Sequence, residues 1–157
     1  MFIKKFMSML LLTATISMTV AVPGHAAMQI TDANSYKWSK TGSEWKVVDG
    51  SGNPASGFIS YNDQTYYVDK NGIMKTGWLL NNNVWYYLKD SGAMATNWQY
   101  INGKWYWLNQ DGAMRTGWKY INNVWYYMED SGAMLENTVR NIDGIDYRFD
   151  VSGAWLP

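Results

Sequence analysis

The sequence predicts an all-β fold, a β-solenoid of stacked β-hairpins with about 20 residues per repeat. The first observation is a twenty-residue period that aligns large aromatic side chains in one column and glycines in another. The second is a pair of turn-forming residues inside each unit, between two short runs rich in aromatic residues. The columns contain Trp38, Phe58, Trp78, Trp98 and Trp118 in the first case, and Gly52, Gly72, Gly92, Gly112 and Gly132 in the second.

The chain begins with a segment typical of a secretory signal peptide, residues 1–26. Lys4 and Lys5 precede an apolar run over 6–22, and small residues follow, so we expect cleavage after Ala26 or Ala27. An uncleaved anchor fits less well, because the run is short and hydroxyl-bearing residues interrupt it between positions 13 and 19. We therefore predict a secreted chain with no membrane span after cleavage.

A short polar lead-in, residues 27–37, comes next and shows no period. The repeat array then occupies residues 38–157 in about six copies. The sixth copy begins near Thr138 and carries one extra residue before its turn, so its features lie 21 residues after those of the fifth. Irregular end copies are typical of an array that must be capped.

Each repeat is predicted to contain a tight hairpin turn, because Asn and Gly tolerate the positive φ angles that such turns need. The strand after the turn is aromatic and β-branched, as in 84–88 and 124–128, which favours a pleated strand over a helix. The glycine of each connection permits a sharp change of direction before the next hairpin. The turn pairs are Asn62-Asp63, Asn82-Asn83, Asn102-Gly103, Asn122-Asn123 and Asp143-Gly144.

The composition gives no sign of an enzyme, a metal site or a cofactor. Loss of the leader removes two of the 13 basic residues and the only histidine, His25, and leaves a net charge of 11 − 13 = −2. The chain has no cysteine, so the usual zinc sites and His- or Cys-dependent nucleophiles are missing. The acidic residues lie mostly in turns, and nothing indicates a nucleic-acid partner.

A third column lies seven residues after the first and holds a second tryptophan in most copies. The rings of Trp78 and Trp85 can meet on one face of their hairpin, and the next hairpin can add a third ring. Such a cage suits a quaternary ammonium, which aromatic rings hold by cation–π attraction. The alternative is that the rings only pack between hairpins. The third column consists of Trp45, Thr65, Trp85, Trp105 and Trp125.

The repeating unit of Thr-Gly-Trp, hairpin turn, Trp-Tyr-Tyr-Leu and Gly-Ala-Met resembles the choline-binding, or cell-wall-binding, repeat of Gram-positive surface proteins and wall hydrolases. The resemblance covers residues 38–155 and is most specific at 77–94 and 117–134. It implies a solenoid of hairpins that binds choline on teichoic acids between successive repeats. Two tryptophans of one repeat and an aromatic residue of the next form each site in that family, often with a methionine nearby.

Carried onto this chain, the resemblance implies three regular sites and one irregular site. The strand 105–107 would close the first site, the strand 125–127 the second, and Tyr147 the third, although Asp146 stands where the family has an aromatic residue. Tyr66 or Tyr67 would close the irregular N-terminal site. We expect no cage at the second copy, which has Phe58 and Thr65 in place of tryptophans. We expect the methionines mainly to fill gaps between hairpins, with a side role as an apolar wall of the cages. The predicted site residues are Trp78, Trp85, Trp98, Trp105, Trp107, Trp118, Trp125, Tyr127, Tyr147, Met94, Met114 and Met134, and, at the irregular site, Trp38, Trp45 and Tyr67.

The function expected from these observations is a secreted, non-catalytic, cell-wall-associated module that recognises choline-bearing teichoic acid. The repeats begin about eleven residues after the leader, so we expect no attached catalytic domain. Two alternatives remain open at this stage: a glucan-binding repeat protein and a surface adhesin that the repeats anchor. A homodimer formed through the last hairpin is a further hypothesis.

Overall fold

The computed structural model describes residues 36–157, so the predicted signal peptide and almost all of the predicted lead-in lie outside the described part. Within that part the secondary structure is entirely β, in successive hairpins of about 20 residues, which confirms the predicted fold class. The antiparallel pairs are β1 (Lys37–Thr41) with β2 (Glu44–Val48), β3 (Gly57–Tyr61) with β4 (Gln64–Val68), β5 (Gly77–Asn81) with β6 (Val84–Leu88), β7 (Asn97–Ile101) with β8 (Lys104–Leu108), β9 (Gly117–Ile121) with β10 (Val124–Met128), and β11 (Thr138–Ile142) with β12 (Ile145–Phe149). A short strand, β13 (Trp155–Leu156), adds to β12.

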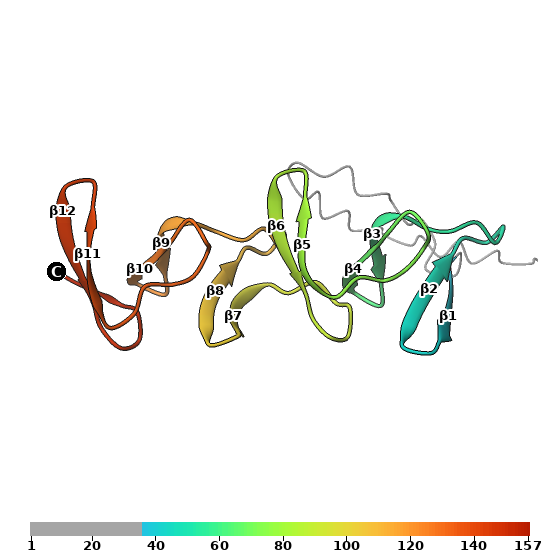
Figure 1. Cartoon of the computed structure of the whole chain (residues 1–157), viewed down its shortest axis with the longest axis horizontal. Coiled ribbons are helices and arrows are strands. Elements are labelled where there is room, and N and C mark those ends of the chain that lie inside the picture. Colours follow the sequence, from blue (N-terminus) through green and yellow to red (C-terminus); the bar gives the residue numbers. More distant parts are fainter. Residues whose placement is uncertain (1–35) are drawn as a thin grey trace, which may run out of the picture.

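The hairpins form an elongated row in chain order (Figure 1). Each hairpin is turned relative to its neighbours about the long axis of the row. The hairpins β1–β2 and β7–β8 extend to one side in Figure 1, whereas β5–β6 and β11–β12 extend to the opposite side. Every third hairpin therefore points in a similar direction, as expected of an array that winds about an axis.

The predicted turn pairs all adopt the left-handed backbone conformation. Asn82 and Asn83 have φ angles of 50° and 60°, and the four other pairs also have positive φ at both positions. Two successive positive φ angles define the type I′ turn, whose twist matches that of the flanking strands. The five pairs thus fix where the second to sixth hairpins reverse.

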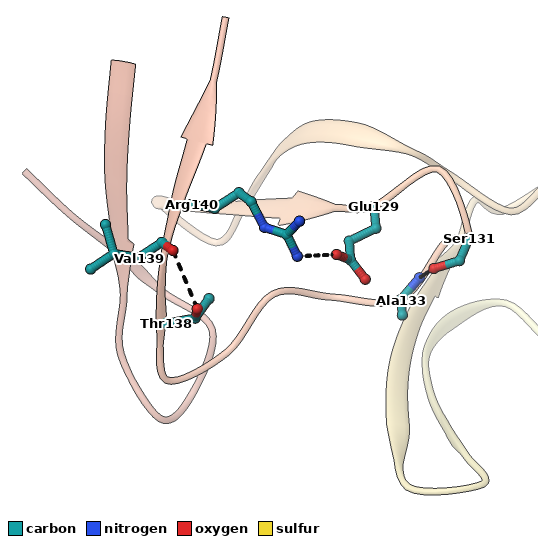
Figure 2. Close-up of polar contacts among 6 residues, drawn as sticks. All are labelled: Glu129, Ser131, Ala133, Thr138, Val139 and Arg140. Atoms are coloured by element: carbon teal, nitrogen blue, oxygen red, sulfur yellow. Dashed lines mark hydrogen bonds and ion pairs between the residues drawn. The ribbon is translucent and has the colours of Figure 1, made fainter. Parts of the chain in front are cut away.

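The loops after the hairpins tie neighbouring units together. The backbone N–H of Met114 donates to the carbonyl oxygen of Trp85 in the preceding hairpin (N···O 2.8 Å), and that of Met134 donates likewise to Trp105 (2.8 Å). A small spine of fully buried residues runs along the array at the ends of the second strands: Val68, Leu88, Leu108, Met128 and Phe149. An ion pair between Arg140 of β11 and Glu129 fastens the last hairpin to the preceding one (Figure 2).

Three of these loops begin with an aspartate that organises the turn. The carboxylates of Asp49, Asp69 and Asp150 each accept backbone N–H groups two and four residues further on. The hydrogen bonds lower the pKa of all three: the Asn53 N–H contributes most at Asp49, the Lys75 ammonium at Asp69 and the Ser152 hydroxyl at Asp150. These acids belong to turn structure, as their positions in the sequence indicate.

Candidate functional site: aromatic cages between hairpins

Each regular hairpin carries its tryptophans on one face. In β5–β6 the register places Trp78 opposite Tyr87 and Leu80 opposite Trp85. Residues directly opposite each other share a face, and alternate residues of a strand do too, so these four side chains project from the same side. We call this side the front face. The rings of Trp78 and Trp85 lie 6.2 Å apart between centroids and are perpendicular.

The third ring comes from the back face of the next hairpin. Tyr106 of β8 lies 4.9 Å from Trp78, measured between ring centroids. The same arrangement recurs at three other junctions, with centroid distances of 5.2 Å for Trp38–Tyr66, 5.0 Å for Trp98–Tyr126 and 4.8 Å for Trp118–Tyr147. Two tryptophans and one tyrosine therefore meet at four junctions of the array, which we call cages.

The two tryptophans of a cage differ in exposure. The leading tryptophans, such as Trp78, are half-buried between hairpins, whereas the second tryptophans remain 38–42% exposed. Burial of one indole and exposure of the other gives each cage a fixed wall and an accessible wall. This is the distribution expected when rings both hold hairpins together and contact a small molecule from solvent.

The last cage has a fourth aromatic wall. Trp155 of β13 lies 6.1 Å from Trp118 and 6.0 Å from Tyr147, between ring centroids. Together with Trp125 these rings line a cavity of about 280 Å³. Trp155 pairs with Phe149 as Met134 pairs with Met128, so it takes the place in the last copy that Met134 has in the fifth. Trp155 is not among the predicted site residues, although it lies 21 residues after Met134, the offset of the sixth copy.

The aspartate of the last copy does not intrude on this cage. Asp146 lies opposite Asn141 and accepts a hydrogen bond from its side-chain amide (Nδ2···Oδ1 2.6 Å). Tyr147, the next residue, projects to the other face of β12 and closes the cage. The face of the last hairpin that carries Asp146 opposite Asn141 also carries Val139 opposite Arg148, so it has no aromatic ring.

Three predicted closing residues lie elsewhere. Tyr67, Trp107 and Tyr127 sit on the front faces of their own hairpins, opposite Phe58, Trp98 and Trp118, at centroid distances of 5.0, 5.3 and 5.2 Å. Because side chains alternate along a strand, the residue one position earlier faces the preceding hairpin. The closing rings are accordingly those of Tyr66, one of the two alternatives at the irregular site, and of Tyr106 and Tyr126, which lie within the two predicted closing strands. The indole N–H of Trp107 is buried and makes no hydrogen bond.

The methionine side chains fill space between successive loops. A Cβ built on Gly112 would come within 2.3 Å of the Met94 sulfur, and Gly132 and Met114 are related in the same way. The backbone bonds described above place Met114 and Met134 next to the cages of Trp85 and Trp105. Met94 instead donates to Thr65 (N···O 2.7 Å), at the junction that lacks a second tryptophan.

That junction, between β3–β4 and β5–β6, is filled by protein. Tyr86 lies 5.0 Å from Phe58 and is only 1% exposed. Burial, with a smaller contribution from the charge of Asp111, raises the pKa of the Tyr86 phenol to about 12. With Thr65 in place of a tryptophan, this junction has no accessible aromatic wall.

Few charged side chains contact the cages of residues 36–157. Residues 36–157 contain no cluster of His, Cys, Asp or Glu side chains that could hold a metal ion. The same residues include no helix long and apolar enough to cross a membrane. One cation does meet a cage: the Nζ of Lys40 lies 5.6 Å from the ring centroid of Trp45. The cages can therefore offer aromatic faces and very little else to a ligand.

Comparison with known families identifies the repeat. The choline-binding repeat matches residues 55–98 and 95–138, which together cover more than half of the chain. No curated protein sequence matches the chain.

Solved structures of similar proteins agree with this assignment. Choline binding protein F from Streptococcus pneumoniae, in the presence of a peptidoglycan analogue, is 41% identical with a TM-score of 0.69, over 77% of this chain and 40% of that protein. CbpJ from Streptococcus pneumoniae is 43% identical (TM-score 0.68; 76% and 40%). The pneumococcal cell wall endolysin of phage Cp-1, complexed with choline, is 35% identical (0.55; 78% and 37%). The chain thus matches about two fifths of the length of these proteins.

Proposed function

Because the chain belongs to the family of choline-binding repeat proteins, we propose that it is a secreted, non-catalytic cell-wall-binding protein that recognises choline groups on teichoic acid. The observation that carries the proposal is the cage, in which two tryptophans of one hairpin and a tyrosine of the next converge at four junctions. One structural relative is complexed with choline, and another was solved with a peptidoglycan analogue. Both facts support a cell-wall ligand.

The chemistry of the cage matches a trimethylammonium group. This group is cationic but has no N–H to donate. Hydrogen-bond acceptors therefore stabilise it little, whereas aromatic faces stabilise it by cation–π attraction. The half-exposed indoles of Trp85, Trp105 and Trp125 offer those faces to solvent. A primary ammonium ion would lose its hydration in the cage and gain no acceptor in return.

Repetition compensates for weak single sites. Each ring of a cage contributes about 1–2 kcal/mol to the binding of the cation, and part of the sum is lost to the entropy cost of binding. We expect a millimolar dissociation constant for a single cage, which corresponds to a net binding free energy of about 4 kcal/mol. Once one cage is occupied, the next engagement along the same polymer is intramolecular, and avidity rises by about 10² to 10⁴. Several weak cages therefore hold the protein on a polymer while each contact still exchanges rapidly.

We propose a binding role without catalysis because the chain that remains after removal of the leader lacks two common catalytic residue types. The only histidine would leave with the signal peptide, and the chain has no cysteine. The proposal therefore assigns these repeats a binding role and no catalytic one. Pairing of two copies through β11–β12 would double the number of cages, and analytical ultracentrifugation of the mature protein tests this hypothesis.

The test is titration of the mature protein with choline, followed by tryptophan fluorescence and by thermal stability. The uncharged isostere 3,3-dimethyl-1-butanol serves as the matched ligand control, because it keeps the shape and loses the charge. We expect saturable stabilisation by millimolar choline and a much weaker response to the isostere. Trp85→Ala and Trp105→Ala should each remove one cage, whereas Ile145→Ala, an exposed apolar residue outside the cages, should change nothing.

Two outcomes would contradict the proposal. Equal responses to choline and to its isostere would show that the charge is irrelevant. Retention on glucan with no response to choline would favour the alternative of a glucan-binding protein.

A further inference from the structure

Two consecutive hairpins expose a tyrosine beside the cage. Tyr100 of β7 is 61% exposed and Tyr120 of β9 is 53% exposed, although both are large aromatic side chains. They follow the leading tryptophans Trp98 and Trp118 by two residues and so share the front face. The cages described above do not use these rings.

Each tyrosine is paired with the accessible tryptophan of its cage. Tyr100 lies directly opposite Trp105, and Tyr120 directly opposite Trp125, with ring centroids 5.0 Å apart in both pairs. The rings are tilted by 48° and 40°, so each pair presents two inclined aromatic faces. We call Tyr100–Trp105 and Tyr120–Trp125 the rim pairs. Each rim pair shares its tryptophan with a cage and is continuous with it.

The fold does not require a ring at this position. Lys40, Ser60 and Leu80 occupy the same place, opposite Trp45, Thr65 and Trp85 in their hairpins. The chain thus forms the same hairpin with a cationic, a small polar or an aliphatic residue there. Because the tyrosines are mostly exposed, they also contribute little buried area to stability.

We propose that the rim pairs are sugar subsites, which bind the sugar residue that carries the choline group recognised by the adjacent cage. The inference rests on the proposed function, and it assigns to the ligand a second part that the cages do not touch. A pyranose ring has one face of C–H groups that can lie against an aromatic ring while its hydroxyl groups stay hydrated. Exposed tyrosine suits this contact, because its ring is apolar and its hydroxyl can remain in water.

Connectivity favours a sugar over other occupants. Choline can be joined to a polymer only through its single hydroxyl group, at the end away from the trimethylammonium group, so the unit that carries it must lie at the mouth of the cage. The rim pairs occupy that place, since Trp105 and Trp125 each belong to both sites. No net charge is present on a tyrosine–tryptophan pair, which matches a neutral sugar better than an ionic partner.

The experiment compares free choline with a phosphocholine ester of a single hexose, using isothermal titration of the mature protein. The variants are Tyr100→Leu and Tyr120→Leu, alone and together. Leucine is the residue that the chain itself has at position 80, so the substitution is compatible with the hairpin. Leu80→Ala is the matched control, since it changes the same position in a hairpin that has no rim pair.

We expect the hexose ester to bind the wild-type protein more tightly than free choline. Each leucine substitution should weaken the affinity of its site for the ester about three- to tenfold and leave the affinity for free choline unchanged. Leu80→Ala should alter neither affinity. Equal wild-type affinities for the two compounds, or equal weakening of both by the leucine variants, would overturn the sugar subsites while leaving the cages intact. Absence of choline binding altogether would overturn the cage proposal, and the sugar subsites with it.

Discussion

Replacing Trp155 by methionine isolates the effect of the fourth wall in the last cage. The substitution installs the residue type that the preceding copies have at this position, such as Met134, so β13 can keep its pairing with β12. It removes one aromatic face from a cavity lined by Trp118, Trp125 and Tyr147. A single cation–π contact contributes about 0.5–2 kcal/mol, so choline affinity at this cage should fall about 2- to 30-fold.

The assay must distinguish one cage from another. The indole N–H resonances of Trp125 and Trp105 report separately on the last cage and on the one before it, so both can be followed by NMR during a choline titration. In the wild-type protein the Trp125 signal should saturate first. In Trp155→Met it should need a higher choline concentration while the Trp105 titration stays unchanged. Simultaneous saturation of both cages in the wild type, or a substitution that shifts neither curve, would show that Trp155 does not contribute to choline binding.

Other regions of the array give three further predictions. Lys40→Leu should raise the choline affinity of the first cage about two- to fivefold, because the Lys40 ammonium lies over the Trp45 ring and competes for it; the Trp45 indole resonance measures the change. Gly72→Ala should destabilise the fold by about 1–3 kcal/mol more than Gly77→Ala in urea unfolding, because both glycines have φ near +80° but only at position 72 would the new Cβ meet a backbone carbonyl oxygen, at 2.5 Å. Tyr86 has a pKa of about 12, above the usual value near 10, so the folded state keeps its proton where the unfolded state loses it. Its contribution to stability is therefore complete below pH 10 and is lost as the pH rises to 12, and Tyr86→Phe should reduce that loss in thermal unfolding; equal slopes for the two proteins would contradict the assignment.

The features that sequence predicts well are those decided within one repeat. Asn82-Asn83 adopts positive φ because asparagine tolerates it, and no distant contact is needed to place the turn. The meeting of Trp78 with Trp85 also follows from strand alternation and one turn. These local rules are sufficient to place the hairpins and the tryptophan pairs.

The features that sequence misses depend on how one hairpin is placed on the next. The ring that closes the cage of Trp78 is Tyr106, not its neighbour Trp107, because the adjoining hairpin presents its back face. The sequence of 105–107 does not indicate which face of this hairpin meets Trp78. Strand alternation shows only that Tyr106 and Trp107 cannot both point toward it. The role of Trp155 cannot be predicted for a similar reason. The last copy is shifted by one residue, and only the structure shows that the strand carrying Trp155 folds against the cage.

The winding of the array determines which spatial arrangement of ligand groups it can bind. Successive hairpins turn about the long axis (Figure 1). The cages at successive junctions are therefore expected to open in different directions. A flat layer of ligand groups could reach the cages on one side only. A loose mesh whose strands pass on every side could fill them all, and one molecule would then hold separate strands together. If the cages bind choline groups as proposed, such an array could join neighbouring polymer strands by reversible contacts.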